Sequence, residues 1–321
     1  MLRYVLLRTV GGLVTLLLIS VLVFASTEVL PGNAASSILG REGTPEKVKL
    51  LKERLGLDRP APVRYADWLE GAVRFDFGES LVQGTGLSGS GAVTGTPISE
   101  IVAPRLAKTA VLAAVTLAVL IPLSLLIGVA TGLTRGSIGD GVTQVGLLVL
   151  ISLPEFVLGA ILVLLFGLVW AVLPAVSLGG SATELVLPVA TIVGVCIAFT
   201  SRFIRSGVSE VASSDHVAMA RMKGLPESRV IRKHILPNAL GPALQSFALV
   251  TAYLAGGVVV VEYLFSYPGI GQGLVAAISG RDVPAIQAYT LLIAVVYVTA
   301  NLVADLITIA LNPRLRASYA H

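Results

Sequence analysis

The sequence predicts an all-α protein that crosses a membrane several times, and its composition and hydropathy both indicate this class. Of its 321 residues, 55% are hydrophobic and only 13% are charged, about half the charged share of a soluble domain. The mean hydropathy is +0.87. Backbone groups in lipid must form their hydrogen bonds internally, and the sequence lacks the alternating segments of a membrane β-barrel. Helices are therefore the expected spanning form.

Composition also excludes several other classes. The chain is too apolar for a disordered, collagen-like or coiled-coil protein. Its one cysteine, Cys196, lies in an apolar run, which excludes an internal disulfide and a cysteine-based metal cluster. The net charge of +4 would suit nucleic-acid binding, so the placement of the basic residues has to decide that question.

Six segments contain the roughly 20 mainly apolar residues that a membrane-spanning helix needs. Pro154 and Glu155 interrupt the third segment, and the fourth is short but flanked by further apolar residues. The predicted fold is therefore a bundle of six transmembrane helices. Its segments are Thr9–Thr27, Thr109–Thr134, Gly141–Leu173, Leu185–Ser201, Ile235–Val261 and Val283–Ala304.

The basic residues gather in alternate connections, which orients the helices. The long connection from Val29 to Glu100 holds eight basic and nine acidic residues. Twelve of the 23 Lys and Arg residues lie on the other side: Arg3, Arg8, Arg135, Arg202, Arg205, Arg221, Lys223, Arg229, Arg232, Lys233, Arg314 and Arg316. Both termini are on that side and are therefore predicted to be cytoplasmic. The positive charge thus reflects membrane topology instead of nucleic-acid binding.

The chain is predicted to have three parts. Residues 1–95 form the first transmembrane helix and an extracytoplasmic segment, residues 96–311 form the transmembrane bundle, and residues 312–321 form a cytoplasmic tail. The first helix is flanked by Arg residues like a secretory signal, but its apolar run is long and it lacks a clear small-x-small cleavage site. We expect it to be retained as an anchor.

The longest cytoplasmic connection, Ser201 to Ala239, is predicted to contain a short amphipathic helix at about residues 211–225. A Ser or Asp near its start can cap a helix, and Gly224 followed by Pro226 is typical of a helix end. Such a helix either rests on the lipid surface or docks into a groove of a cytoplasmic partner. Its predicted apolar stripe consists of Val208, Val211, Ala218, Met222 and Leu225.

The same loop resembles the "EAA loop" of ABC-importer permeases, in which a helix and a Gly precede nine residues, a hydrophobic position and Leu-Pro. The form found here is most similar to that of the dipeptide and oligopeptide branch. Ala218 stands where the general motif has Glu, and His234 occupies the hydrophobic position. The matching loop comprises Asp215, His216, Val217, Ala220, Arg221, Met222, Lys223, Gly224 and Leu225, followed by Leu236 and Pro237.

Further segments extend the resemblance over nearly the whole chain, and their order and spacing match the family. Asn312 stands where the family usually has Asp. The segments are Leu30–Gly32, Leu55–Pro60, Tyr65 with Trp68–Leu69, Asp76–Ser80, Glu262–Gly271, Arg281–Pro284 with Gln287, Asn301–Asp305 and Asn312–Arg316.

The resemblance implies a type I ABC-importer permease in a bacterial inner membrane, a transport subunit without catalytic residues. It implies a second homologous permease, two cytoplasmic ABC ATPases, an extracytoplasmic binding protein and a di- or oligopeptide substrate. The loop helix would be the coupling helix that docks on an ATPase. The sequence has no G-x-x-x-x-G-K-[ST] phosphate loop, so ATP and Mg would bind to the ATPases. His216 and His234 have no second ligand at metal-binding spacing, so no metal site is predicted.

Ionisable groups inside spans are costly and usually functional. Glu155, which follows Pro154, is therefore a candidate to line the pathway or to bind a peptide amine. Pro154 itself either marks a kink near the pathway or is a tolerated bend. Glu262 and Asp305 lie near span ends, where solvation at the interface or a salt bridge is the expected explanation.

Three alternative functions remain open from the sequence. Related permeases that import nickel or another small solute share these motifs. An ion-driven secondary carrier would show inverted repeats and paired broken helices, neither of which we find in the sequence. A membrane-embedded enzyme is the third alternative.

Overall fold

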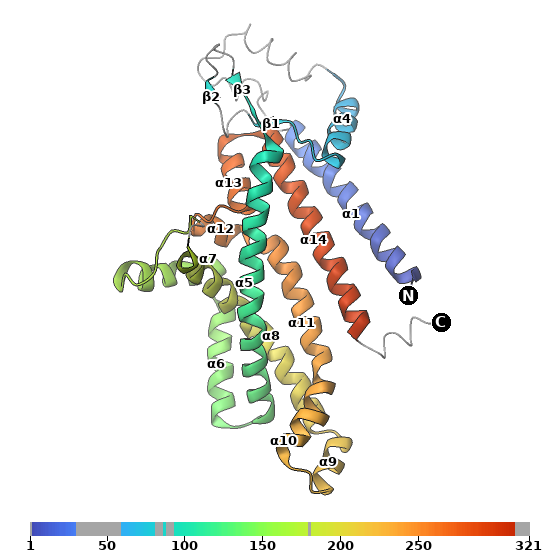
Figure 1. The fold of residues 1–321 in the computed structure, drawn as a ribbon, viewed down its shortest axis with the longest axis vertical. Helices are drawn as coiled ribbons and strands as arrows, with labels where there is room; N and C mark the ends of the chain where they lie inside the picture. Colours follow the sequence, from blue (N-terminus) through green and yellow to red (C-terminus); the bar gives the residue numbers. More distant parts are fainter. Residues whose placement is uncertain (1, 30–58, 81–85, 88–92, 179–180, 312–321) are drawn as a thin grey trace. The chain divides into compact units, whose positions relative to one another are not determined.

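The structure, a computed structural model, describes residues 2–29, 59–80, 86–87, 93–178 and 181–311 and is predominantly helical (Figure 1). Its longest helices are α1 (Leu2–Val29), α5 (Ile98–Leu133), α8 (Val186–Ala212) and α14 (Val283–Leu311). The Leu30–Gly32 segment, most of Leu55–Pro60 and the predicted tail at 312–321 with Asn312 lie outside the described residues.

Four helices of the described chain are long and apolar enough to cross a membrane, or up to six if each of two bent helix pairs is one span. One bent pair joins α6 (Ile138–Ser152) to α7 (Glu155–Leu162) and the π-helix η2 (Val163–Val169), and the chain bends by 104° between them. The other runs through the short helix α10 (Glu227–Val230) and the π-helix η4 (Ile231–Ile235) into α11 (Leu236–Gly257). A helical polytopic membrane protein is thus confirmed, while the count of six depends on the bent pairs.

The fourth predicted span is longer than its apolar run. The sequence suggested an end near Ser201, but α8 continues to Ala212 and carries Arg202 and Arg205 within the helix. The predicted connection therefore begins eleven residues later. These two arginines do not end the helix, because Arg205 pairs with Asp140 and Arg202 lies on an exposed face.

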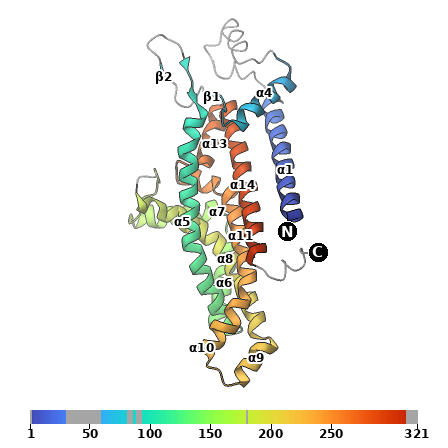
Figure 2. The ribbon, with the colours of Figure 1, turned by 45° about the vertical axis from the view of Figure 1, so that its right-hand side comes forward.

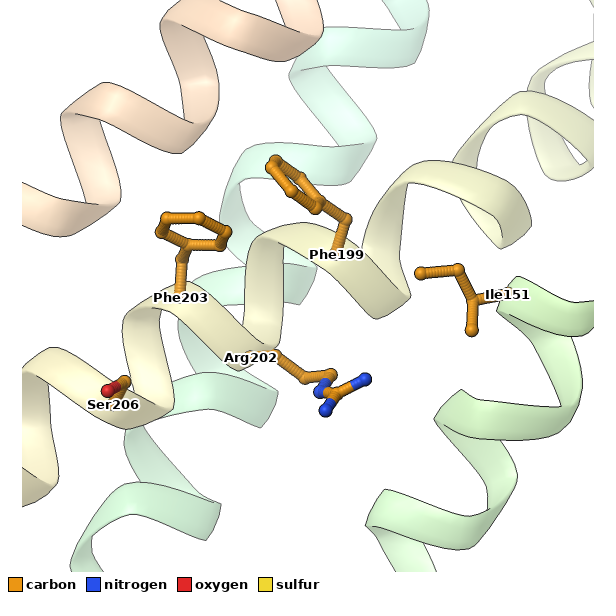
Figure 3. A pocket seen from close by; sticks show the side chains of 5 residues that line it. All are labelled: Ile151, Phe199, Arg202, Phe203 and Ser206. Carbon is orange, nitrogen blue, oxygen red and sulfur yellow. The ribbon is translucent and has the colours of Figure 1, made fainter.

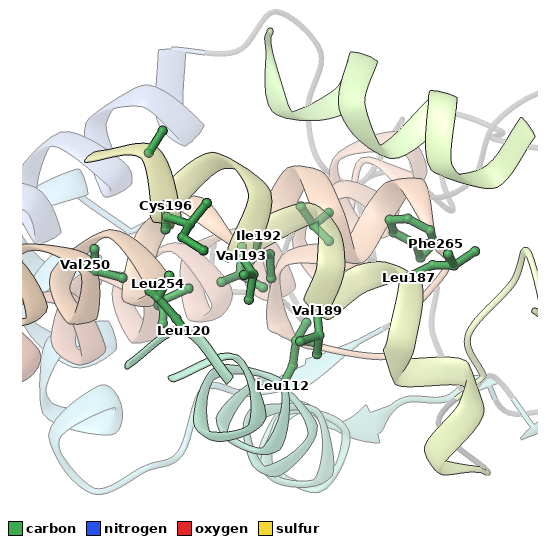
Figure 4. Close-up of a cluster of buried hydrophobic side chains, with 14 of the residues drawn as sticks. Leu112, Leu120, Leu187, Val189, Ile192, Val193, Cys196, Val250, Leu254 and Phe265 are labelled. Atoms are coloured by element: carbon green, nitrogen blue, oxygen red, sulfur yellow. The ribbon is translucent and has the colours of Figure 1, made fainter. Parts of the chain in front are cut away.

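The chain divides into two compact units, of which the first contains residues 1–9, 110–267 and 297–321. Its main core is apolar and surrounds α8, whose residues from Leu187 to Ala198 are largely buried (Figure 4). Leu112 and Leu120 of α5 and Leu254 of α11 pack into this core. Because α8 is apolar around much of its circumference here, it is a central helix of the unit.

Two glycines let α5 approach α8 closely. A Cβ atom at Gly128 would lie 2.6 Å from the Cβ of Ile204, and one at Gly132 would lie 2.8 Å from the Cβ of Val208. The two glycines are four residues apart and therefore lie on one face of α5, the small-xxx-small arrangement that brings helix backbones together in membranes.

The second unit contains residues 10–109 and 268–296. Around α13 (Ile270–Gly280), buried side chains such as Phe77, Ile98 and Tyr289 form its core. The hydroxyl of Ser80 donates to the carboxylate of Asp282, which also accepts from the backbone N–H of Ala285 and so caps α14.

The remaining elements of the second unit are short. The helix α4 (Ala61–Val73) contacts α1 through the rings of Phe24, Tyr65 and Trp68. Two antiparallel ladders pair β1 (Glu79–Ser80) with β4 (Thr96–Pro97) and β2 (Gly86–Leu87) with β3 (Val93–Thr94).

The two acidic residues near span ends have different environments. Asp305 forms a salt bridge with Arg8, at 3.2 Å between Oδ2 and Nε, as expected from the sequence. Glu262, in α12 (Val259–Leu264), is fully buried. Solvation at an interface is therefore the wrong explanation for Glu262.

Candidate functional site

The predicted loop helix is present as α9 (Asp215–Met222), which follows α8 after a break at Ser213 and Ser214 (Figure 1). Ser214 occupies the N-cap position, but its hydroxyl donates to the carbonyl of Val211 at 2.5 Å and contacts His216 Nδ1 at 2.9 Å. The side-chain cap expected at this position is therefore not formed.

The end of α9 has the geometry that the sequence indicated. Gly224 has a φ of +73°, a conformation that favours glycine. The N–H of Gly224 donates to the carbonyl of Arg221 at 2.9 Å, and that of Leu225 donates to the carbonyl of Ala220 at 3.4 Å. This bond pair is the Schellman motif, which satisfies the last carbonyls of the helix and turns the chain away from its axis.

The buried face of α9 differs from the predicted stripe. Val217 and Ala220 are buried, and Leu225 packs against the same cluster, whereas Ala218 is exposed and Met222 is 76% exposed. The predicted stripe assumed one helix through residues 208–225, but the break at Ser213 changes its phase. Val217 and Ala220 pack with Ile204 and Val208 of α8 and with Val230, Ile235, Ala239 and Ala243 of the following segment.

Arg221 joins the elements around α9. Its guanidinium donates to both carboxylate oxygens of Glu227, at 2.7 and 3.2 Å, and to the carbonyl of Ala212 at the end of α8, at 3.2 Å. The hydrogen bonds to Glu227 raise the pKa of Arg221 above its usual range. The ionised pair of Arg221 and Glu227 therefore stabilises the charged form of both side chains.

The Leu236–Pro237 pair of the resemblance marks the start of α11. Pro237 is the second residue of α11, which continues directly from η4, and its missing N–H removes one hydrogen bond from this continuous helical run. The helices α8 and α11 run side by side in both views, and α9 lies where they end (Figures 1 and 2). Thus α9 is connected at each end to a long helix of the same unit, while His216 and Lys223 remain exposed.

An ion pair fastens the α5–α6 turn to α8 near this site. Arg205 donates from Nε and Nη2 to the two carboxylate oxygens of Asp140, both at 2.7 Å. Asp140 is only 4% exposed and also accepts from the backbone N–H of Gly136, while Arg135 donates to Ser209 Oγ at 3.0 Å. No pattern in the sequence predicts this pair, since its members are 65 residues apart.

The second predicted site residue, Glu155, lies where the third span breaks. Pro154 separates α6 from α7, and Glu155 is in the first turn of α7. The hydroxyl of Tyr253, on α11, donates to the Glu155 carboxylate. Both side chains are partly exposed, so this polar pair is accessible at the bend.

The grouping of potential metal ligands can be stated for the part of the chain that the structure describes. Within it, no three His, Cys, Asp or Glu residues are grouped so that they could hold an ion. Cys196 is buried and forms no disulfide.

A helical bundle with several candidate membrane spans defines a polytopic membrane protein. The description "Binding-protein-dependent transport system inner membrane component" matches residues 121–317, and its N-terminal counterpart matches residues 1–113. The chain therefore belongs to the family of binding-protein-dependent ABC-importer permeases.

Curated relatives extend this similarity over almost the full length. The glutathione transport system permease protein GsiC of Salmonella choleraesuis is 34% identical over 316 residues, which cover 98% of this chain and 99% of the relative. GsiC of Salmonella typhimurium has the same identity and coverage. GsiC of Escherichia coli strain K12 is 33% identical with the same coverage.

Membership defines the kind of subunit. The chain is a multi-pass inner-membrane protein and a non-catalytic component of an ABC importer, in a family whose permeases bind no cofactor. The family implies a partner permease, ATPases and a binding protein.

We predict that the Asp140–Arg205 pair stabilises the fold of the first unit. Asp140→Asn or Arg205→Gln should each lower the Tm of the purified protein in detergent, because the first leaves the half-buried Arg205 and the second the buried Asp140 without its partner. Exchanging the charges, with Asp140→Arg and Arg205→Asp together, should recover part of the loss. The exposed Arg59–Asp67 pair is the control: Asp67→Asn should hardly change Tm. Equal effects at the two pairs would contradict the prediction.

Proposed function

We propose that this chain is the permease of an importer for di- or oligopeptides and forms the translocation pathway together with a second, homologous permease. An external binding protein delivers the peptide, and partner ATPases bind ATP and Mg and drive transport. The form of the loop, similar to that of the peptide branch, supports this substrate class. So does the similarity to relatives whose name states that they transport glutathione, itself a small peptide.

The observation that carries the proposal is the geometry of α9. Its buried face, Val217 and Ala220, attaches it to the rest of the unit, whereas Met219 and Met222 are 54% and 76% exposed. Residues three apart lie on one face of a helix, and flexible methionine side chains adapt well to apolar grooves. We infer that these two methionines enter a cleft of an ATPase and that α9 is the coupling helix.

The charges around α9 support its cytoplasmic placement and that of both termini. Lys223 lies just after α9, and Arg229, Arg232 and Lys233 follow in α10 and η4. Connections rich in Lys and Arg remain on the cytoplasmic side of bacterial membranes. This end would therefore face the ATPases, and the segment after α1 would face the binding protein.

Glu155 is proposed as a pathway residue. Its carboxylate lies at the bend of a broken span, is partly exposed and accepts a hydrogen bond from Tyr253. Broken helices place polar groups at membrane depth where these line a cavity. A carboxylate in that position suits the N-terminal amine of a peptide.

Uptake measurements test the proposed function. We expect proteoliposomes that contain the complete importer, supplied with binding protein and with ATP at the ATPase side, to accumulate a labelled peptide. Accumulation should stop without ATP and persist when ion gradients are collapsed. Uptake driven by an ion gradient would instead indicate a secondary carrier, and uptake of nickel but not of peptide would overturn the proposed substrate class.

The docking face of α9 is tested by Met222→Glu. A charge in an apolar groove is costly, so we expect less ATPase to copurify with the permease and peptide uptake to fall at least tenfold. The control is Val73→Glu at the end of α4, which alters an apolar side chain that is 82% exposed and outside the candidate spans. If both variants retain the ATPase equally, α9 is not the docking element.

The role of Glu155 is tested by Glu155→Gln, with Tyr253→Phe as the control that removes only the hydrogen-bond donor. Uptake is compared for two peptides that the binding protein delivers, one with a free and one with an acetylated N-terminus. We expect Glu155→Gln to reduce uptake of the free-amine peptide about tenfold and to spare the acetylated one, since only the first loses a charged contact. An equal reduction for both peptides would indicate a structural role.

A further inference from the structure

A pocket between α6 and α8 contains an arginine that the roles described above do not use. Ile151 of α6 lines it together with Phe199, Arg202, Phe203 and Ser206 of α8, and its volume is about 410 Å³. Figure 3 shows the guanidinium of Arg202 pointing away from α8 toward the side on which Ile151 of α6 lies. The volume is within the range of small-molecule sites.

Arg202 lies one helical turn before Arg205, but of the two only Arg205 has an acidic partner in the described chain that neutralises its charge. Arg205 is neutralised by its two hydrogen bonds to Asp140. Arg202 is exposed, and among the described residues it has no ion-pair or hydrogen-bond partner. It lies in the candidate span Ala182–Ala212, and a stretch of about twenty residues from Val186 would extend just past it. A cation near the end of a span, with no neutralising partner among these residues and beside a pocket, is available to bind an anion.

The chemistry of the pocket indicates which anion would bind. A guanidinium presents parallel N–H groups that match both oxygens of one carboxylate. The rings of Phe199 and Phe203 pack with centroids 4.6 Å apart and give the pocket an apolar wall for a neighbouring side chain. Sites for anionic lipid headgroups usually collect several Lys or Arg residues, whereas Arg202 is the one cation in this lining. The lining therefore favours one singly charged carboxylate over a phosphate.

We propose that Arg202 binds the C-terminal carboxylate of a peptide on its way through the permease. This inference rests on the proposed function and adds an anion site to it. Ile151 of the pocket is four residues before Glu155, on the other side of the Pro154 break. The same broken span thus contributes Ile151 of α6 to the carboxylate site and Glu155 of α7 to the proposed amine site.

The charge preference of the pocket can be measured without any peptide. The native Cys196 is buried, so a thiol introduced by Ser206→Cys is the accessible one. For each thiol we take the ratio of its modification rate by an anionic methanethiosulfonate to its rate by a cationic one. In the assembled importer we expect this ratio to be about tenfold higher for Ser206→Cys than for Ser279→Cys on the exposed end of α13. Arg202→Gln should abolish this preference. An unchanged preference in that variant would overturn the assignment.

Transport then tests the ligand. Uptake of a peptide with a free C-terminus is compared with that of its amide, both chosen because the binding protein delivers them. We expect Arg202→Gln to reduce uptake of the free acid about tenfold and to spare the amide, and Arg202→Lys to retain part of the activity.

Three further outcomes separate the explanations. If Arg202→Gln impairs both peptides equally, or only in vesicles that contain anionic lipid, the residue serves the fold or a headgroup and the proposal is wrong. If the wild-type importer transports neither peptide, the proposed function itself fails and this inference fails with it. If the wild-type importer transports both and the variant is indistinguishable from it, only the carboxylate site is refuted.

Discussion

The close approach of α5 to α8 is the contact on which the organisation of the first unit depends. In lipid, apolar side chains gain nothing by leaving one hydrocarbon environment for another, so van der Waals contact and polar links must hold helices together. Gly128 and Gly132 permit that contact, and the Asp140–Arg205 pair adds a polar link between the start of α6 and α8. With α5 and α6 held in this way, α8 has a fixed surface against which α11 and α9 can pack.

Because α9 is held by buried contacts and by Arg221, it cannot swing independently of its neighbours. Val217 and Ala220 share one apolar cluster with residues of α8 and of the segment leading into α11. A force applied to the exposed side of α9 would therefore reach the long helices as a movement of a packed body. Small shifts at one site produce larger rearrangements elsewhere when the connecting elements are rigid, which is what an ATP-driven permease requires.

The sequence predicted best those features that depend on local chemistry. Apolar runs located the spans, and Gly224 marked the end of α9 because its positive φ is a local requirement. The end of α8 was placed too early, since Arg202 and Arg205 resemble loop residues unless their surroundings are known. The apolar stripe of α9 was wrong because the break at Ser213 is not visible in the sequence pattern. The Asp140–Arg205 and Glu155–Tyr253 pairs join distant segments, so only the tertiary structure reveals them. The closely spaced Gly128 and Gly132 were a readable signal for helix contact that the sequence reasoning did not use.

The Asp140–Arg205 pair has a consequence for biosynthesis. Asp140 leaves the ribosome 65 residues before Arg205, so its carboxylate must wait at the membrane surface until the helix that carries its partner has been made. Two hydrogen bonds from one guanidinium form only when both helices enter the bilayer in the correct register. The pair therefore favours the correctly threaded bundle over misassembled ones while the chain is still being inserted.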